Sequence, residues 1–313
     1  MSSKKLAVDW HHRCGILLVF AAASSFAFKG ILAKLSYQEG ITITALLLIR
    51  FLIATPLFWI APTFISKKAN ISKLTKSDFL LCVVSGLLFF ISAFTDFKAI
   101  SLIDVGIERV IFFSYPVFII LLNSLITRRL PLLSHIYVFV VIEFGIMLIM
   151  GFASKENIFK GNIEGTLWAM CAAISYAFYL MMGQQIMKKI GSIPFTIIAN
   201  TATFIFLLLQ FLLFSSISEL SVSGLGLFYI LLIALFCTVI PFFMVFEGIQ
   251  RIGATKAALI SMTGPVVTIF ASHFLLKEKL DHCQIIGVFL VLGGIALLEG
   301  HSSLKKFLNY LRE

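Results

Sequence analysis

Two similar heptapeptides in different halves of the chain decide the fold. The first is Ala22-Ala23-Ser24-Ser25-Phe26-Ala27-Phe28, and the second is Ala172-Ala173-Ile174-Ser175-Tyr176-Ala177-Phe178. With a shift of 149 residues, the stretch 99–151 aligns with 248–300 without a gap, so that Pro116 falls on Pro265. Apolar sequences match by chance at Leu or Ile, but coincident prolines and glycines are more informative. We therefore expect an internal duplication of the chain.

The composition predicts that lipid is the solvent of both repeats. Of 313 residues, 60% are hydrophobic and 13% are charged, and the mean hydropathy is +1.03. Soluble domains average about 45–50% apolar and about 25% charged residues. These values exclude an ordinary cytosolic enzyme, a nucleic-acid-binding domain and a disordered chain. The 33 phenylalanines are expected at lipid-facing and helix-packing positions.

Ten runs are long and apolar enough to span a bilayer, for which a helix needs roughly 20 residues. The first run lacks a clear cleavage site and is followed almost at once by another, so we do not expect a cleaved signal peptide. The predicted spans are 15–36, 43–61, 79–98, 103–127, 133–152, 164–187, 194–215, 224–247, 254–276 and 282–299.

The lysines and arginines predict the orientation. If the N-terminus is cytoplasmic, sixteen of them lie in inside segments and six in outside segments, as the positive-inside rule requires. We therefore expect both termini in the cytoplasm of a multi-pass inner (plasma) membrane protein. The net charge of +10 is then mostly an orientation signal, and no nucleic-acid partner is expected.

Five spans in each unit force the second unit to enter from the opposite side, so the repeats are expected to be inverted. The predicted fold class is an all-α membrane protein with ten transmembrane helices in two inverted five-helix repeats, an arrangement common among secondary transporters. The predicted parts are a cytoplasmic tail (1–14), the first repeat (15–152), an external linker (153–163), the second repeat (164–300) and a cytoplasmic amphipathic tail (301–313). That last tail is interpreted as a short helix on the inner leaflet, or as a solvated end.

Several motifs resemble those of one known family. They are Gly15–Leu35, Arg50–Ala54, Glu108–Pro116, Gly253–Leu259, Gly264–Val266 and Leu275–Leu280. In their order and spacing they resemble the EamA-like ten-helix permeases of the drug/metabolite transporter superfamily. The family usually has Gly-Glu in the last motif, where this chain has Lys277-Glu278, and the position equivalent to Glu278 in the first half is Arg129.

The resemblance implies export or uptake of small metabolites, often amino acids or related compounds. We expect a secondary transporter of a small polar or amphipathic molecule, driven by a coupling proton or an exchanged metabolite, in a monomer or a homodimer. Two other functions stay open: an intramembrane enzyme acting on lipid, and a membrane protein that transports nothing. The sequence contains no catalytic constellation, phosphate-binding loop or metal motif, so we expect no cofactor and no metal.

Charged residues within spans are the leading candidates for a substrate cavity, because lipid tolerates them poorly. Lys29, on the face of Ser25, either holds an anionic or zwitterionic substrate, snorkels outward, or pairs with Glu108 or Asp96; its repeat counterpart is Tyr179. Asp96 is interpreted as part of an outer gate or as a solvated residue. Glu108 and Arg109 point about 100° apart on a helix, so we expect only one of them to line the cavity.

Three further charges have structural interpretations. Arg50 is expected to anchor helices or lipid headgroups rather than bind substrate. Glu143 is either protonated or paired with Arg50, and Glu247 is expected to pair locally with Arg251 or Lys256.

Prolines within spans predict interrupted helices near the cavity. Each removes an N–H and frees a carbonyl four residues earlier, which must then be satisfied by protein or by cavity water. Pro116 and Pro265 are the repeat-related pair, and Pro241 is a further hinge candidate. The hydroxyls that flank the first two are candidate substrate contacts: Ser114, Tyr115, Ser261 and Thr263.

Overall fold

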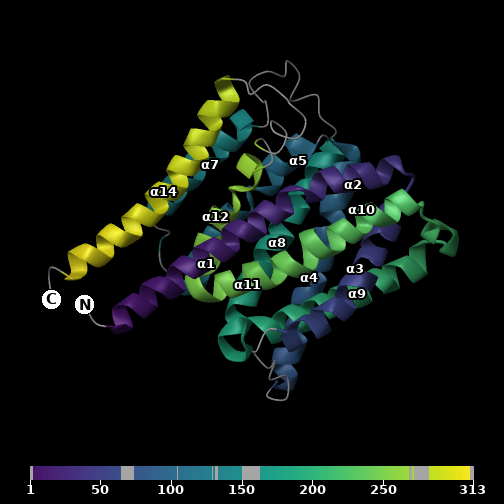
Figure 1. Cartoon of the computed structure of the whole chain (residues 1–313), viewed down its shortest axis with the longest axis horizontal. Helices are drawn as coiled ribbons and strands as arrows, with labels where there is room; N and C mark the ends of the chain where they lie inside the picture. The colour runs from purple at the N-terminus through teal and green to yellow at the C-terminus, as the bar shows by residue number, and fades with distance from the viewer. Residues whose placement is uncertain are drawn as a thin grey trace.

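A computed structural model describes residues 3–64, 74–103, 105–128, 130, 133–149, 163–267, 270 and 282–310 (Figure 1). Within these residues the chain is helical and contains no strand. The first half contains α1 (Ser3–Ala27), α2 (Lys29–Gln38), α3 (Ile43–Phe64), α4 (Lys76–Leu102), α5 (Val105–Phe112), α6 (Tyr115–Thr127) and α7 (Leu133–Ile149). The second half contains α8 (Ile163–Ile190), α9 (Ser192–Phe214), the 3-10 helix η3 (Ile217–Leu220), α10 (Gly224–Ala234), the π-helix η4 (Leu235–Val239), α11 (Ile240–Ile252), α12 (Ala254–Ser261) and α14 (His282–Tyr310).

Seven helical stretches of the described part are long and apolar enough to cross a membrane. They are Trp10–Gln38, Ile43–Thr63, Lys76–Leu102, Ile107–Thr127, Ile163–Ile190, Ser192–Phe214 and Gly224–Ile252. His135–Ile149 and His282–Leu297 are shorter apolar helices. The predicted span 254–276 continues into residues outside the described part. Almost all of the predicted linker 153–163 also lies outside the described part. The chain is an all-helical, multi-pass membrane protein.

Four predicted spans are interrupted rather than continuous. The run predicted at 15–36 is two helices, α1 and α2, which meet at Phe28. α5 and α6 are separated by a turn just before Pro116, and α12 ends at Ser261, four residues before Pro265. The path from α10 to α11 runs through the π turn η4, which ends two residues before Pro241. Because proline cannot donate to the preceding turn, three of these interruptions lie where the sequence predicts them.

The two chain ends also differ from the predicted boundaries. α1 begins at Ser3, within the segment predicted as an N-terminal tail. α14 continues as one helix to Tyr310, so the backbone has no break at residue 300, where a separate amphipathic tail was predicted. The helical run is therefore longer than the apolar run at both ends.

Helices from opposite halves of the chain pack against each other throughout the bundle (Figure 1). The pairs are α4 with α8, α1 with α11, α3 with α9, α6 with α12, and α7 with α14. The core between them contains small residues such as Ala22, Ala172 and Ala177 beside large aromatic rings. Small residues let helices approach closely, which is how helices associate in lipid.

Glycine makes the closest approaches. A Cβ atom on Gly86 of α4 would lie 2.5 Å from the carbonyl oxygen of Ala199 and 2.6 Å from the Cβ of Ala202, both on α9. Gly145 of α7 and Gly287 of α14 face each other in the same way, since a Cβ on either would lie within 2.8 Å of the other's carbonyl oxygen. At both places the two backbones are in direct contact.

We expect Gly86→Ala to destabilise the protein by about 1–3 kcal/mol, because the added methyl group has to push α4 away from α9. The midpoint of thermal unfolding of the purified protein in detergent measures this. Gly293→Ala in α14 is the matched control, because a Cβ there would have no atom within 4 Å. Equal midpoints for the two variants would contradict the close contact.

Candidate functional site

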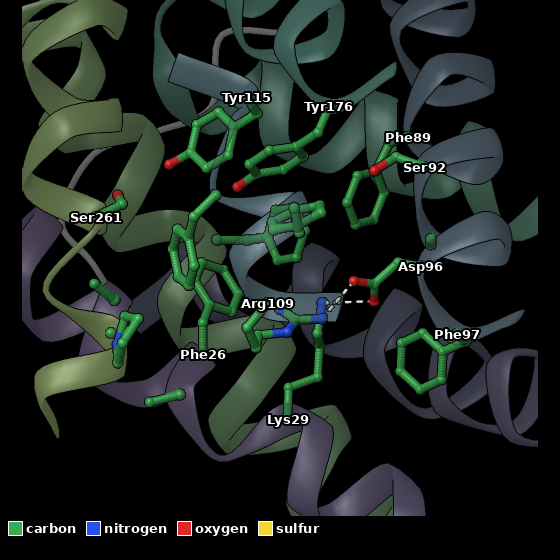
Figure 2. A pocket seen from close by; sticks show the side chains of 18 of the residues that line it. Phe26, Lys29, Phe89, Ser92, Asp96, Phe97, Arg109, Tyr115, Tyr176 and Ser261 are labelled. Atoms are coloured by element: carbon green, nitrogen blue, oxygen red, sulfur yellow. Dashed lines mark hydrogen bonds and ion pairs between the residues drawn. The ribbon is translucent and has the colours of Figure 1, made fainter. Parts of the chain in front are cut away.

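A cavity lies inside the bundle where the interrupted helices meet (Figure 2). Its volume is about 70 Å³, and a single water needs roughly 10–15 Å³, so it has room for several waters or a small organic group. Its wall is formed by Ala23, Phe26, Ala27, Lys29, Arg50, Phe89, Ser92, Ala93, Asp96, Phe97, Arg109, Phe112, Phe113, Tyr115, Tyr176, Phe242, Ser261, Gly264 and Pro265. Both halves of the chain contribute to this wall.

Asp96 is the centre of the charged end of the cavity. Its carboxylate accepts a hydrogen bond from Lys29 Nζ at 2.9 Å and another from a terminal guanidinium nitrogen of Arg109. Figure 2 shows both cations reaching this one carboxylate. Asp96 is only 1% exposed, so the prediction that it is a solvated residue is wrong. The predicted pairing of Lys29 with Asp96 is confirmed.

Glu108 and Arg109 meet, although they were predicted to point apart. Arg109 Nε donates to Glu108 Oε2. The helix α5 is only eight residues long, and the long arginine side chain bends back toward the carboxylate of its neighbour. Arg109 lines the cavity, whereas Glu108 is fully buried outside the wall. One of the two therefore faces the cavity, as predicted, but they also form an ion pair.

Arg50 is buried in the wall of the same cavity. Its Nε donates to Thr238 Oγ1 at 2.7 Å, and its guanidinium carbon lies 5.2 and 5.5 Å from the ring centroids of Phe51 and Phe97. Thr238 belongs to the π turn η4 and donates in turn to the carbonyl of Ile233. Arg50 thus joins α3 to the interrupted helix, as the anchor interpretation predicts, and it also faces the cavity.

The opposite end of the cavity is aromatic and hydroxylated. Figure 2 shows Tyr115, Tyr176 and Ser261 there, away from Asp96. Tyr115 Oη donates to the carbonyl of Ala258 at 3.2 Å, which joins α6 to α12. The rings of Tyr115 and Tyr176 are 5.0 Å apart and nearly perpendicular, a favourable edge-to-face geometry.

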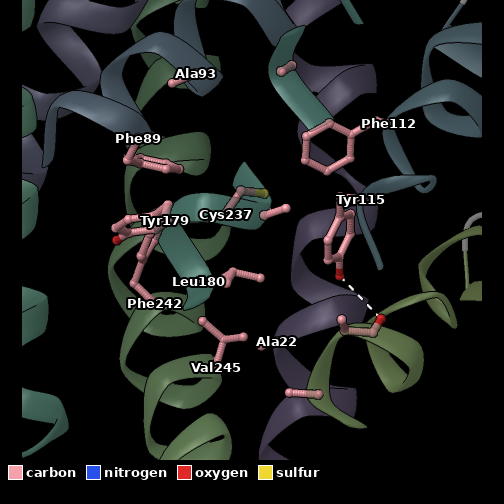
Figure 3. Close-up of a cluster of buried hydrophobic side chains, with 14 of the residues drawn as sticks. Ala22, Phe89, Ala93, Phe112, Tyr115, Tyr179, Leu180, Cys237, Phe242 and Val245 are labelled. Atoms are coloured by element: carbon pink, nitrogen blue, oxygen red, sulfur yellow. Dashed lines mark hydrogen bonds between the residues drawn. The ribbon is translucent and has the colours of Figure 1, made fainter. Parts of the chain in front are cut away.

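Besides Glu108, four predicted cavity residues lie elsewhere. Tyr179 is buried in the aromatic cluster beside the cavity, 4.8 Å from Phe89 between ring centroids (Figure 3). Thr263 donates to the carbonyl of Ile260, and the backbone carbonyl of Ser25 accepts a hydrogen bond from Cys237 Sγ. Ser114 lies at the start of α6 and does not line the cavity. Their expected contact with substrate stays a prediction.

Two further charges lie away from the cavity. Glu247 accepts two hydrogen bonds from Arg251, at 3.0 and 2.7 Å, which confirms the predicted local pairing. Glu143 Oε2 is buried and has no hydrogen-bond partner among the described residues. The described residues do not place Glu143 in an ion pair with Arg50.

Comparisons with known proteins identify the family of this chain. The model of the EamA-like transporter family matches residues 13–151 and again residues 163–299. The chain belongs to the EamA-like transporter family. A family relative, the uncharacterized transporter YcbK of Bacillus subtilis, is 31% identical over 90% of this chain and 92% of its own length. The uncharacterized transporter sll1319 of Synechocystis is 27% identical over 91% of this chain and 93% of its own length.

A solved structure has the same fold. It superposes with a TM-score of 0.72 and 16% sequence identity over 91% of this chain and 96% of that one. Because the chain belongs to the EamA-like transporter family, and its relatives are named transporters, it is a membrane transporter rather than an enzyme.

The sequence missed most of the apolar wall of this EamA-like transporter. Phe26, Phe89, Phe112 and Phe242 line the cavity, although phenylalanines were expected at lipid-facing and packing positions. With 33 in the chain, composition does not single them out. Arg50 was also missed as a cavity residue, for another reason. An arginine inside a span is itself a signal, but it was interpreted as an anchor rather than as part of the cavity wall.

We expect Asp96→Asn to destabilise this transporter by about 3–5 kcal/mol, because it leaves Lys29 and Arg109 buried without their shared carboxylate. The double variant Lys29→Met/Asp96→Asn should lose less than the sum of its single variants, since it also removes one of the stranded charges. Thermal unfolding in detergent measures all three.

The matched control is the pair of Lys189 and Asp78 at the end of the bundle, whose Nζ–Oδ1 distance is 3.2 Å. Its lysine side chain is 65% exposed, whereas that of Asp78 is 8% exposed. Its coupling is expected to stay within about 1 kcal/mol. Additive effects at Lys29 and Asp96 would contradict a shared buried carboxylate.

Proposed function

We propose that this protein is a secondary transporter of a small polar or amphipathic metabolite, such as an amino acid or a related compound. The observation that carries the proposal is the cavity itself. Lys29, Arg50, Asp96 and Arg109 line a cavity within a bundle that lipid surrounds. Charges at this depth are expensive and typically mark a substrate or ion pathway. Discontinuous helices around a binding site are also typical of such transporters.

The proposed mechanism is alternating access between two inverted five-helix repeats with ten spans. The two successive matches to the family model support a duplication. The packing also supports a pseudo-twofold relation between the halves, because exchanging equivalent helices turns each observed helix pair into another observed pair or into itself. The equivalent helices are α1 and α8, α3 and α9, α4 and α10–α11, α5–α6 and α12, and α7 and α14. Such a pseudo-twofold relation gives two related states, one open to each side.

Polar contacts between the halves lie at both ends of the bundle. At one end Glu219 Oε2 accepts hydrogen bonds from Thr42 and Thr44, at 2.8 and 2.9 Å, and Ser223 donates to Glu39. At the other end Lys189 pairs with Asp78. The helix α9 connects the two ends over 23 residues, or roughly 35 Å at 1.5 Å per residue. We propose that these two sets of contacts open in turn.

The proposed orientation puts both termini in the cytoplasm and the Glu219 end outside. It follows from the excess of lysine and arginine in the inside segments. The sequence lacks a nucleotide-binding loop, so we propose that transport is driven by a proton gradient or by exchange of one metabolite for another.

Flux into liposomes tests the proposal. We expect the purified protein in liposomes to carry at least one compound of a metabolite panel faster than empty liposomes do. Lys29→Met should lower that flux by about tenfold or more, because it removes a charge at the cavity. Lys98→Gln, two residues from Asp96 but outside the cavity wall, is the matched control and should retain it.

Either of two results would contradict the proposal. Flux no faster than in empty liposomes for every compound would favour a protein that transports nothing. Chemical conversion of added lipid, in place of flux, would favour an intramembrane enzyme. A flux that follows a pH gradient and falls in Glu108→Gln or Glu143→Gln would identify proton coupling, whereas one indifferent to the gradient points to exchange.

The contacts of Glu219 predict a pH dependence of stability. Hydrogen bonds from Thr42, from the backbone N–H of Ser216 and from Thr44 hold the pKa of Glu219 below its ordinary value of 4.5. A lowered pKa in the folded state gives stability that is present above the ordinary pKa and is lost as the pH falls through the folded pKa. The unfolding midpoint of the wild type should therefore exceed that of Glu219→Gln at pH 7, and the gap should shrink below pH 4.5.

The double variant Thr42→Val/Thr44→Val is the control for this pH dependence. It removes two of the donors to Glu219. In this background, adding Glu219→Gln should therefore change the unfolding midpoint only slightly, even at neutral pH. A gap that stays constant from pH 7 to pH 3 would show that the ionised form of Glu219 is not what these contacts stabilise.

A further inference from the structure

The charged end of the cavity is unbalanced. Three cations, Lys29, Arg50 and Arg109, lie near two carboxylates, Asp96 and Glu108. Lys29 and Arg109 share Asp96, and Arg109 also pairs with Glu108. Among the described residues Arg50 forms no ion pair, and its side chain bonds to the neutral hydroxyl of Thr238. The excess positive charge is therefore at Arg50.

The guanidinium of Arg50 is buried with part of its bonding capacity unused. The residue is 2% exposed and lines the cavity, and its Nη1 has no hydrogen-bond partner among the described residues. The rings of Phe51 and Phe97 contact it but accept no conventional hydrogen bond. An arginine stays protonated in proteins, and an unpaired buried charge is costly. The site is incomplete until an anion enters it.

The carboxylates of the site offer no equivalent place for a cation. Both oxygens of Asp96 already accept hydrogen bonds, one from Lys29 and one from Arg109. Glu108 is fully buried behind Arg109 and does not line the cavity. A ligand with an ammonium group would find no free negative charge on the wall. The wall of the cavity is thus suited to bind a negative group of a ligand and not a positive one.

The remainder of the wall is aromatic. Phe26, Phe89, Phe112 and Phe242 line the cavity. Figure 2 shows Phe26 and Phe89 on this wall, with the hydroxyls of Tyr115 and Tyr176 at the end away from Asp96. The ring of Phe242 stands edge-on to those of Phe26 and Phe89, with centroids 5.8 and 4.9 Å apart. Edge-to-face rings of this kind pack well against another apolar or aromatic group.

We propose that the substrate is a small organic monoanion with one carboxylate and a short apolar body, and that Arg50 binds its carboxylate. The proposal rests on the transport function proposed above and narrows its substrate class. It requires the substrate to have a carboxylate but does not require an amino group. A guanidinium is suited to this task, since its planar fork matches the two oxygens of a carboxylate.

Four probes of one size test the requirement for charge. They are butanoate, its neutral amide butanamide, the cation butylamine and zwitterionic 2-aminobutanoate. Binding to the purified full chain in detergent is measured by calorimetry, because the protonated acid crosses lipid unaided. We expect butanoate to bind about tenfold or more tightly than the amide, which lacks a charge-assisted hydrogen bond. The amine should bind more weakly still, and 2-aminobutanoate no more tightly than butanoate.

Variants assign the effect to Arg50. Arg50→Gln should abolish the preference for the acid over the amide, whereas Arg50→Lys should keep part of it. Arg13→Gln removes an exposed arginine from α1 and should leave the preference unchanged. Where Arg50→Gln does not fold, Thr238→Val keeps the charge but removes the hydroxyl that holds Nε, and should weaken binding of the acid severalfold while leaving that of the amide unchanged.

Several results would overturn the proposal. They are equal binding of acid and amide, tighter binding of the amine, absence of binding by the acid, and an undiminished preference for the acid in Arg50→Gln. Flux assays separate this failure from failure of the transport function. Transport of an amine or a neutral compound that does not depend on Arg50 would refute the carboxylate site and leave the transporter intact.

Discussion

The shared carboxylate of Asp96 is the interaction on which the rest of the site depends. It lies inside a bundle surrounded by lipid and pairs with two cations from two other helices, Lys29 of α2 and Arg109 of α5. Burying either cation there without a carboxylate would be costly, so this one side chain fixes the positions of α2, α4 and α5 relative to each other. Because α2 begins and α5 ends at an interruption of a longer span, the same interaction lies close to the points where those spans break.

Interrupted helices and buried charges thus explain each other. Breaks at Phe28, before Pro116, after Ser261 and at the π turn before Pro241 free backbone groups that lipid would not tolerate. A cavity that holds water or substrate can satisfy them, and three of the four breaks directly adjoin residues of the cavity wall. The fourth contributes Thr238, the hydroxyl that holds Arg50. Glycines such as Gly86, against α9, allow direct backbone contact between the surrounding helices.

Much of this was predictable from sequence, and the reason differs from residue to residue. Lys29, Asp96 and Arg109 were found because a charge within an apolar run is a strong local signal. Pro116 and Pro265 were found because they coincide in the two repeats. The meeting of Glu108 with Arg109 was not, since ideal helix geometry separates neighbours and only the short α5 and the bend of the arginine side chain bring them together. The phenylalanines of the wall could not be chosen, because whether a phenylalanine faces lipid, core or cavity is decided by packing between distant helices. The break at Phe28 could not be predicted in this way, because no proline lies near it in the sequence.

The central claim is that the two ends of the bundle open in turn around this cavity. Spin labels on exposed residues measure it: Gln38 with Ser218 reports on the Glu219 end, and Lys76 with Lys188 on the Asp78 end. In Glu219→Gln, electron–electron distance measurements should show the Gln38–Ser218 distance lengthening while the Lys76–Lys188 distance stays short. If both distances lengthened together, or neither moved, the bundle would not be alternating between two closures.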